Sequence, residues 1–177
     1  MTPESLLGIG VGLALAAAAG FRVFVPLLVL SLAARAGWVE LSPSFDWLAS
    51  TSASVALATA MVLEIAAYYV PFFDNLLDTL AAPVAVLAGI VASASVLTDL
   101  PPWLQYGIAI IGAGGTAGVV HASTSLLRLK SSAATAGFGN PILATLELAG
   151  SVLIALLAVP LMCIGWGFLY SWLMRGF

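Results

Sequence analysis

The sequence predicts an all-α, polytopic membrane protein: a bundle of about five transmembrane helices, some of them broken, with short interfacial helices. Three observations support this fold class. Of the 177 residues, 62% are hydrophobic and only 7% are charged, which lies far outside the range of soluble domains. The apolar residues form runs long enough to cross a bilayer of about 30 Å. Glycine and proline interrupt these runs, which indicates helices that break inside the membrane.

Net charge and cysteine content exclude several classes of protein. The net charge of -3 provides no basic surface for nucleic acid, so no nucleic-acid partner is expected. One cysteine, Cys163, excludes an intramolecular disulfide and a cysteine metal cluster. Catalysis has little support, because the chain has no H-E-x-x-H, G-x-S-x-G or P-loop motif. Ser131 or Ser132 near His121 is the one nucleophile pair to consider, and no cofactor is expected.

The first half of the chain, 5–98, is expected to form the first unit with a linking helix, three spans in all. Its first run, 5–34, would give about 45 Å of helix, more than a bilayer requires. Gly20 and Pro26 are expected to break this helix, and Arg22 lies between them. Backbone groups freed at the break could then share a polar pocket with this charge.

The remainder of this unit contains a loop, two spans and a surface segment. An interfacial loop over 35–50 leads to a second span at 51–70. An aromatic belt of Tyr68, Tyr69, Phe72 and Phe73 is expected at the end of that span. Asp74 and Asp78, four residues apart, predict a short amphipathic helix at the membrane surface. A short third span is expected at 83–98.

The second half, 103–165, is expected to form a second unit of two spans. The fourth span, 103–127, contains a group of glycines at mid-depth, Gly112, Gly114, Gly115 and Gly118. The fifth span runs from Pro141 to about Gly165 and carries Glu147 near its start. The tail over 166–177, which is rich in aromatic residues, predicts an interfacial helix.

Five spans would place the first and fourth in opposite directions, so two similar units would form an inverted repeat. Interrupted helices in corresponding positions of two such units are typical of a transporter with a binding site at the midplane. Basic residues do not set an orientation: Arg128 and Lys130 would lie on one side, and Arg35 and Arg175 on the other. Balanced charge permits an antiparallel dimer, and a homo-oligomer is expected.

Four ionisable residues within the spans predict a binding site. Arg22, Glu64, His121 and Glu147 are expected to converge near the repeat interface, because an isolated charge in hydrocarbon is costly. Two alternatives stay open. Arg22 could form a structural salt bridge with Glu64 or Glu147. His121 could simply hydrogen-bond a backbone carbonyl, although its titration near neutral pH would suit proton coupling.

The segment 128–140 provides a second candidate site. It concentrates basic, hydroxyl and glycine residues ahead of a helix, namely Arg128, Lys130, Ser131, Ser132, Gly137, Gly139 and Asn140. Backbone amides at a helix N-terminus beside basic side chains could bind an anion or a lipid phosphate. The alternative is an ordinary capped turn, with Asn140 as N-cap, whose basic residues meet headgroups.

Carboxylates suggest a third candidate site. Asp74 and Asp78 could join Glu64 in binding a hard cation, because such ions prefer carboxylate oxygens. The alternative is a solvated helix face, on which this spacing is common, so a metal is the minority interpretation.

Two stretches of the chain resemble a known family. One runs from Glu64 through Pro71 and Asp74 to Asp78; the other runs from His121 through Arg128, Ser131 and Thr135 to GFGNP and Glu147. Together they resemble the bacterial membrane family called domain of unknown function 4126 (DUF4126). The resemblance implies a helical membrane protein and no particular activity. This chain departs from the family pattern at Tyr68 and Tyr69, where an acidic residue followed by lysine is favoured, and at Thr124, where lysine is frequent. Each departure removes charge.

These observations predict a multi-pass transporter or channel of the cell inner (plasma) membrane, acting on a small polar or anionic solute. Its expected partners are membrane lipids, the solute or ion, and further copies of the chain. The alternative is a non-transporting membrane module that binds lipid headgroups or a partner protein. One spatial observation would separate the two: transport predicts that Glu64, His121 and Glu147 surround one polar cavity.

Overall fold

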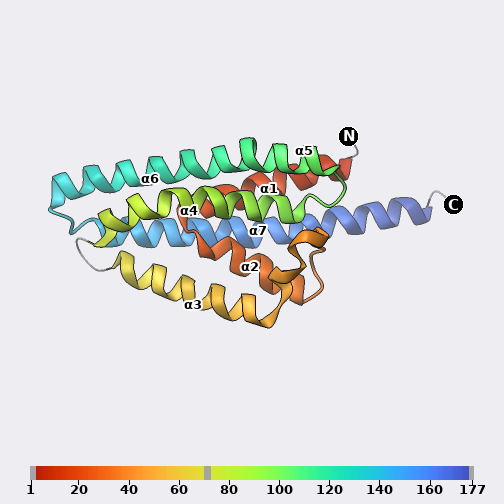
Figure 1. The fold of residues 1–177 in the computed structure, drawn as a ribbon, viewed down its shortest axis with the longest axis horizontal. Helices are drawn as coiled ribbons and strands as arrows, with labels where there is room; N and C mark the ends of the chain where they lie inside the picture. The colour runs from red at the N-terminus through yellow and green to blue at the C-terminus, as the bar shows by residue number, and fades with distance from the viewer. Residues whose placement is uncertain (1–2, 70–72, 176–177) are drawn as a thin grey trace.

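A computed structural model describes residues 3–69 and 73–175, with side chains over 5–69 and 78–161. The described residues form an elongated bundle of helices (Figure 1). In chain order these are α1 Pro3–Phe21, α2 Phe24–Arg35, the 3₁₀ helix η1 Pro43–Ala49, α3 Thr51–Tyr68, α4 Phe73–Val96, α5 Pro102–Gly107, the π-helix η2 Ile108–Ala113, α6 Gly114–Thr135 and α7 Asn140–Arg175. The all-α membrane bundle expected from composition is confirmed.

Within the described ranges, four helices are long and apolar enough to cross a membrane. They are Thr51–Tyr68, Asp78–Val96, Pro102–Thr135 and Asn140–Leu161, and the last three include most of α4, the continuous α5–η2–α6 helix and the first part of α7. Two further apolar helices, Ser5–Phe21 and Phe24–Arg35, are shorter. The expectation of five spans therefore differs from the structure at the start of the chain, where one bent span was predicted.

The first two helices form a hairpin rather than a kinked span (Figure 1). Near the start of α1, Gly8 faces Val96 and Leu97 at the end of α4. Near the end of α1, Gly20 faces Val120 of α6. Val120 lies near the middle of the 34-residue helix that runs from α5 to α6, so the tip of the hairpin stops part-way along the bundle.

The second helix of the hairpin returns to the end at which α1 began. Ser31 of α2 donates from its hydroxyl to the Leu48 carbonyl oxygen over 2.6 Å and lies 2.8 Å from the Ser54 hydroxyl at the start of α3. Beyond α2, the Ser42 amide donates to the Ser95 carbonyl oxygen at the end of α4 over 2.8 Å. Because the ends of both hairpin helices meet the end of α4, the hairpin enters and leaves on one side.

This hairpin changes the direction of every later helix relative to α1. Gly20 meets Val120 and Gly112 meets Leu13, so α1 and α6 run in the same direction; the expectation that they cross in opposite directions is wrong. The inverted repeat is accordingly not confirmed, and the division into units at 5–98 and 103–165 stays a prediction. The α2 helix ends on the side of the bundle at which α1 begins (Figure 1), and Arg35 is its last residue.

Small residues allow α1, α4 and α6 to approach closely. A Cβ added at Gly12 would lie 2.5 Å from the Ser93 hydroxyl oxygen, and one added at Gly89 would lie 2.7 Å from the Ala117 Cβ and 3.3 Å from the Ala16 Cβ. Such contacts are how membrane helices associate when no hydrophobic force drives them together. In the first run, Gly8, Gly12 and Ala16 recur every four residues, a small-residue face that permits close helix contact.

Two helices continue through positions at which the sequence predicted boundaries. The α4 helix begins at Phe73 and includes Asp78 and Pro83 without interruption, so the separate surface helix expected at Asp78 is absent from the described part of the chain. The α7 helix continues through Gly165 to Arg175 and extends beyond the bundle (Figure 1). Residues 166–175 of the expected interfacial tail helix therefore form the last part of α7, and 176–177 lie outside the described residues.

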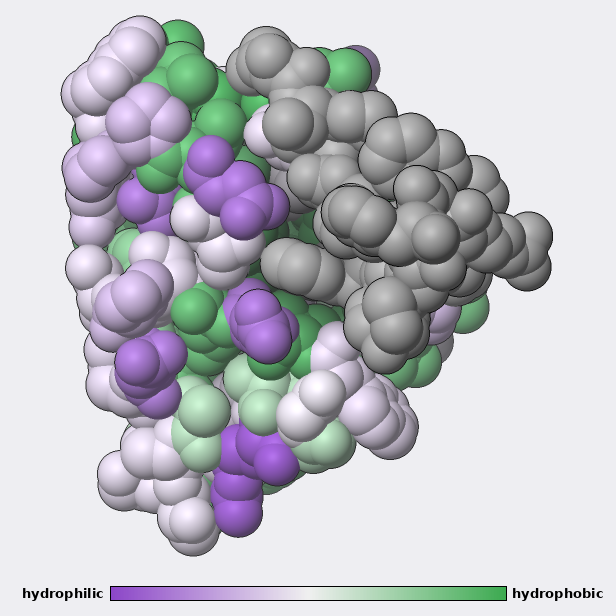
Figure 2. Space-filling view, turned by 90° about the vertical axis from the view of Figure 1, so that its right-hand side faces the viewer, coloured by the Kyte–Doolittle hydropathy of each residue, from purple (hydrophilic) through white to green (hydrophobic). Residues whose placement is uncertain are grey.

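The end of the molecule that carries both chain termini has the polarity expected where protein meets water. Figure 2 looks onto this end and shows separate hydrophilic patches among apolar ones. Among the described side chains, the exposed charged residues near this end include Arg35 at the end of α2, Asp46 in η1, and Glu40 and Asp99 in loops. The tip of the hairpin, in contrast, lies inside the bundle.

Candidate functional site

The hairpin reverses at Arg22 and Val23, and a carboxylate from α3 stabilises the reversal. Glu64 accepts hydrogen bonds from the backbone amides of Val23 over 2.8 Å and Phe24 over 3.2 Å, one to each carboxylate oxygen. The first turn of a helix leaves such amides without helical partners, and Pro26, in the same turn, has no amide hydrogen to satisfy. Glu64 thus serves as the N-terminal cap of α2, and the break expected between Gly20 and Pro26 is present.

Four buried ionisable side chains meet beside this tip. Arg128 of α6 donates through two nitrogens to the two carboxylate oxygens of Glu147 in α7, and its Nη1 lies 2.5 Å from the Asp78 Oδ1 in α4. Arg22 Nη2 lies 3.5 Å from the Glu147 Oε2 and donates to the Ala144 carbonyl oxygen over 2.8 Å. We call Arg22, Asp78, Arg128 and Glu147 the ionic cluster.

An aromatic ring joins the two arginines of the ionic cluster. The guanidinium carbon of Arg22 lies 4.0 Å from the centroid of the Tyr68 ring, and that of Arg128 lies 4.1 Å from it. The Tyr68 hydroxyl donates to the Asp78 Oδ1 over 3.2 Å. The ring therefore provides two cation–π contacts as well as a hydrogen bond, and it is not part of a surface belt as the sequence suggested.

The ionic cluster is almost closed to solvent. Arg22 and Arg128 are each 1% exposed, Glu147 is 6% exposed and Asp78 is 8% exposed. Charges at this depth are tolerated only when they are paired, and here two guanidinium groups face two carboxylates. The expectation that ionisable residues at depth meet in one place is therefore met for Arg22 and Glu147. Asp78 and Arg128, which were predicted at surface positions, join them.

Glu64 is the additional negative charge at this site. It is 8% exposed and has no guanidinium nitrogen within salt-bridge distance among the described residues. Its partners are instead the two amides at the start of α2, where the helix dipole carries partial positive charge. The charges of the ionic cluster balance one another, and the charge of Glu64 is balanced by the helix end.

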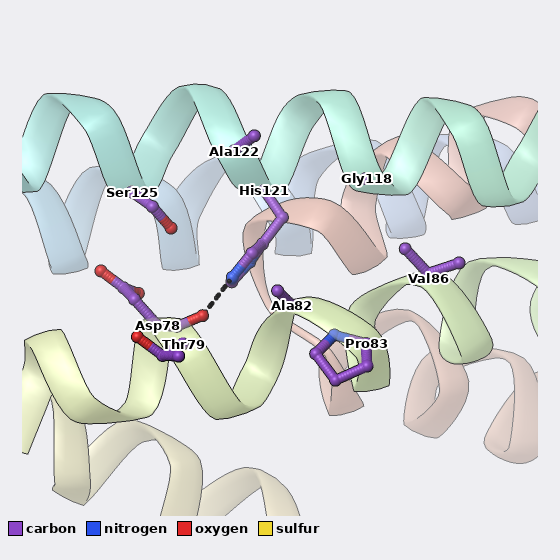
Figure 3. A pocket seen from close by; sticks show the side chains of 9 residues that line it. All are labelled: Asp78, Thr79, Ala82, Pro83, Val86, Gly118, His121, Ala122 and Ser125. Atoms are coloured by element: carbon purple, nitrogen blue, oxygen red, sulfur yellow. Dashed lines mark hydrogen bonds between the residues drawn. The ribbon is translucent and has the colours of Figure 1, made fainter.

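His121 lies beside the ionic cluster but faces a different space. Its Nε2 lies 3.0 Å from the Asp78 carbonyl oxygen, the plain hydrogen bond that the sequence allowed (Figure 3). It lines a cleft of about 460 Å³ between α4 and α6, together with Ser125 and Pro83. Figure 3 shows the side chains of His121 and Ser125 directed from α6 toward α4 across this α4–α6 cleft.

Glu64 lines a second cleft on the other side of α4. This α3–α4 cleft has a volume of about 450 Å³, and its lining includes Tyr68, Val23 and Phe24. In the part of the chain that the structure describes, Glu64 and His121 share no cleft, and Glu147 lines neither. The single polar cavity expected around these three residues is thus replaced by an ionic cluster between two clefts.

The loop before α7 forms a closed turn. The Gly139 amide donates to the Thr135 hydroxyl over 2.9 Å, and the Asn140 side-chain nitrogen lies 2.8 Å from the Ser132 hydroxyl. Arg128 points into the ionic cluster instead of toward this loop. The anion or lipid-phosphate site expected here loses its arginine and one of its amides, so the geometry favours the capped turn.

The cation site expected at the carboxylates is also rearranged. Asp78 faces Arg128, whereas the Asp74 side chain lies outside the described residues. Among the residues that are described, no group of three His, Cys, Asp or Glu side chains is placed to hold a metal ion. A guanidinium group at 2.5 Å from the Asp78 carboxylate takes the position that a cation would need.

Sequence reasoning missed the role of three buried residues. Tyr68 lies four residues after Glu64, a spacing that places both on one face of a helix, so the helix period could have assigned it to the site. Thr124 is buried and donates from its hydroxyl to the His121 carbonyl oxygen over 2.9 Å. Ala144, which offers only its backbone carbonyl to Arg22, carries no signal in the sequence.

These features define a class of protein: a polytopic α-helical membrane protein with a helical hairpin whose tip meets buried, paired charges. A family model described as domain of unknown function (DUF4126) matches residues 9–175, nearly the whole chain. The chain belongs to this family, as its sequence motifs indicated. No curated protein and no solved structure matches it.

Proposed function

We propose that this protein is a transporter or channel for a small polar or anionic solute, with the ionic cluster and Glu64 as its polar centre. The observation that carries the proposal is the hairpin, whose α2 helix begins inside the bundle beside five buried ionisable residues. Non-helical backbone at membrane depth is tolerated where it is enclosed by protein or lines a polar cavity. Half-helix ends that face charged groups are typical of transporter binding sites.

The free-energy cost of burying the charges of the ionic cluster supports a functional role for these residues. Replacing a buried ion pair with apolar residues of similar volume is often neutral or stabilising, so stability alone does not require these charges. The two clefts lie on opposite sides of the N-terminal half of α4, with Asp78 at one and Tyr68 at the other. A solute could reach the ionic cluster from either cleft if the hydrogen bond between these two residues opened.

The proposal includes the setting of the protein. We place it in the cell inner (plasma) membrane, in contact with lipids and assembled as a homo-oligomer. Arg22 and Glu64 would contact the solute, and His121 would relay protons along the α4–α6 cleft, since the two nitrogens of an imidazole ring can donate and accept a proton.

Flux through proteoliposomes tests this function. Vesicles that contain the purified protein are loaded with candidate solutes, including formate, chloride and small zwitterions, and efflux is measured after dilution. We expect efflux of at least one solute from wild-type vesicles and its loss in Glu147→Gln and His121→Ala. Lys130→Gln, which alters an exposed charge on α6, is the matched control and should behave as the wild type. Equal flux in every variant would remove these residues from a transport mechanism.

One observation favours the alternative, a non-transporting module that binds lipid headgroups or a partner protein. Within the described residues, Glu64 and His121 line separate clefts rather than one cavity. For a lipid-binding module, no solute would cross the vesicles. Native mass spectrometry would instead find a phospholipid that is retained by the wild type and lost when the α4–α6 cleft is filled by Gly118→Leu.

A further inference from the structure

At the tip of the hairpin, the start of α2 holds a carboxylate of the chain itself. Each oxygen of Glu64 accepts one backbone amide, from Val23 at 2.8 Å and from Phe24 at 3.2 Å. No side chain of α2 itself caps this helix end. The positive end of the 12-residue α2 helix therefore binds a planar carboxylate through both of its oxygens.

A second observation points to a ligand at the same place. Arg22 is 1% exposed, yet its Nε and Nη1 atoms have no hydrogen-bond partner among the described residues. Buried donors of this kind cost free energy unless something accepts from them. Arg22 directly precedes Val23, and its guanidinium group stacks on Tyr68, which lines the same cleft as Glu64. The unpaired donor atoms thus belong to the residue that directly precedes the two amides in the chain, although Arg22 itself does not line the cleft.

The site has a route to its surroundings. Glu64, Val23 and Phe24 all line the α3–α4 cleft of about 450 Å³, which exceeds the volume of a molecule with only a few heavy atoms. Because the charges of the ionic cluster already balance, an incoming anion would have to replace the charge of Glu64 rather than add to it. The carboxylate of Glu64 would move into the cleft as the ligand enters.

We propose that the tip of the hairpin binds a small monocarboxylate, of the size of formate or acetate, which displaces Glu64 from the amides of Val23 and Phe24 and is held by Arg22. This inference rests on the proposed transport function, because it names the solute class and assigns Glu64 as the internal competitor. A monocarboxylate fits best, since it reproduces the two oxygens that now accept one amide each. Two successive amides can also donate to a single monatomic anion, so bromide is the competitor that tests this choice.

A binding measurement in detergent tests this without transport. Thermal unfolding of the purified protein is followed while formate is titrated against gluconate at constant ionic strength. Glu64→Gln keeps the side-chain volume but removes the competing charge, so it should bind formate at least tenfold more tightly than wild type. At saturating formate its midpoint should rise by about 5 °C. Glu40→Gln, an exposed glutamate in the loop after α2, is the matched control and should follow the wild type.

Several results would overturn the proposal. These are equal formate affinity in wild type and Glu64→Gln, no saturable response in either protein, or bromide binding as tightly as formate. If Glu64→Gln does not fold, the Glu64→Ala variant is purified instead, because its shorter side chain leaves the two amides open to a ligand. Formate or acetate added during purification should recover a monodisperse protein where gluconate does not, and failure to recover it refutes the site.

The binding and efflux experiments together distinguish failure of the proposed monocarboxylate site from failure of the proposed transport function. Tight formate binding by Glu64→Gln without formate efflux from vesicles would retain the site and reject transport. Efflux of another solute that depends on Glu147, together with no formate binding, would retain transport and reject the assignment of this ligand.

Discussion

Removal of Arg128 should destabilise the protein more than any other single change in the ionic cluster. Its guanidinium group contacts both Glu147 and Asp78 and stacks 4.1 Å from the Tyr68 centroid, and the residue is 1% exposed. Arg128→Leu leaves two carboxylates in the bundle with only Arg22 nearby. Removing one partner of a buried ion pair typically costs about 3–5 kcal/mol. For a chain of 177 residues, this corresponds to a fall of about 6–20 °C in the unfolding midpoint.

Thermal unfolding in detergent, followed by tryptophan fluorescence and by size-exclusion chromatography, measures this fall. Lys130→Leu is the matched control, because it removes an exposed positive charge from the same helix; it should change stability by about 0.5 kcal/mol or less. Arg128→Leu combined with Glu147→Gln should recover part of the loss, since one arginine then faces one aspartate and the charges of the cluster balance again. Equal unfolding midpoints for Arg128→Leu and Lys130→Leu would refute the stabilising role of Arg128. A double variant no more stable than Arg128→Leu would refute the charge-balance argument.

Three further predictions test the packing, the aromatic contact and the topology. Gly20→Ala should destabilise by about 1–3 kcal/mol, because its Cβ would lie 2.6 Å from the Val120 Cβ; Gly10→Ala, which meets nothing within 4 Å, should be neutral or stabilising. Tyr68→Phe should cost about 0.5–1.5 kcal/mol for the lost hydrogen bond, and Tyr68→Leu should cost more because both cation–π contacts also disappear; equal costs in thermal unfolding would dismiss those contacts. Accessible tags placed before Pro3 and after Arg175 should label from the same side of the membrane, and labelling from opposite sides would contradict the hairpin.

The proposed function depends on how the two clefts relate to the ionic cluster. Transport requires the hydrogen bond from Tyr68 to Asp78 to open, so that the α3–α4 cleft and the α4–α6 cleft communicate. A π-helical segment, Ile108–Ala113, precedes α6 in the same continuous helix. Such segments are frequent at functional sites because their wider turn accommodates shifts in register. In the proposed mechanism, movement of α6 relative to α4 would open the route.

Several features could be predicted from the sequence because they depend on local chemistry. The break near Arg22 follows from a glycine and a proline six residues apart. The burial of Glu147 and Arg22 in ion pairs follows from the cost of charge in hydrocarbon, which leaves pairing as the alternative to exclusion. Close packing through Gly12 follows from the spacing of small residues in the first run.

Other features could not be predicted, because the sequence leaves more than one solution with similar local energy. A helix break at Arg22 can produce a kink or a full reversal, and the local sequence does not distinguish the two. Asp78 was assigned to a surface helix because its spacing from Asp74 suits a solvated face. Its actual partner, Arg128, lies 50 positions away in the chain. The clefts on the two sides of α4 likewise depend on where neighbouring helices lie.

Composition and the length of the apolar runs determined that this chain resides in a membrane as helices, because a run of about 20 apolar residues crosses the bilayer as a helix that satisfies its own backbone groups. They also determined that the few charged residues within the spans would need partners. The tertiary structure decided which partners they have and on which side of the bundle the chain turns back. The reason is physical: close packing of α1 against α4 and α6 fixes the hairpin, and the hairpin places the start of α2 beside Glu64.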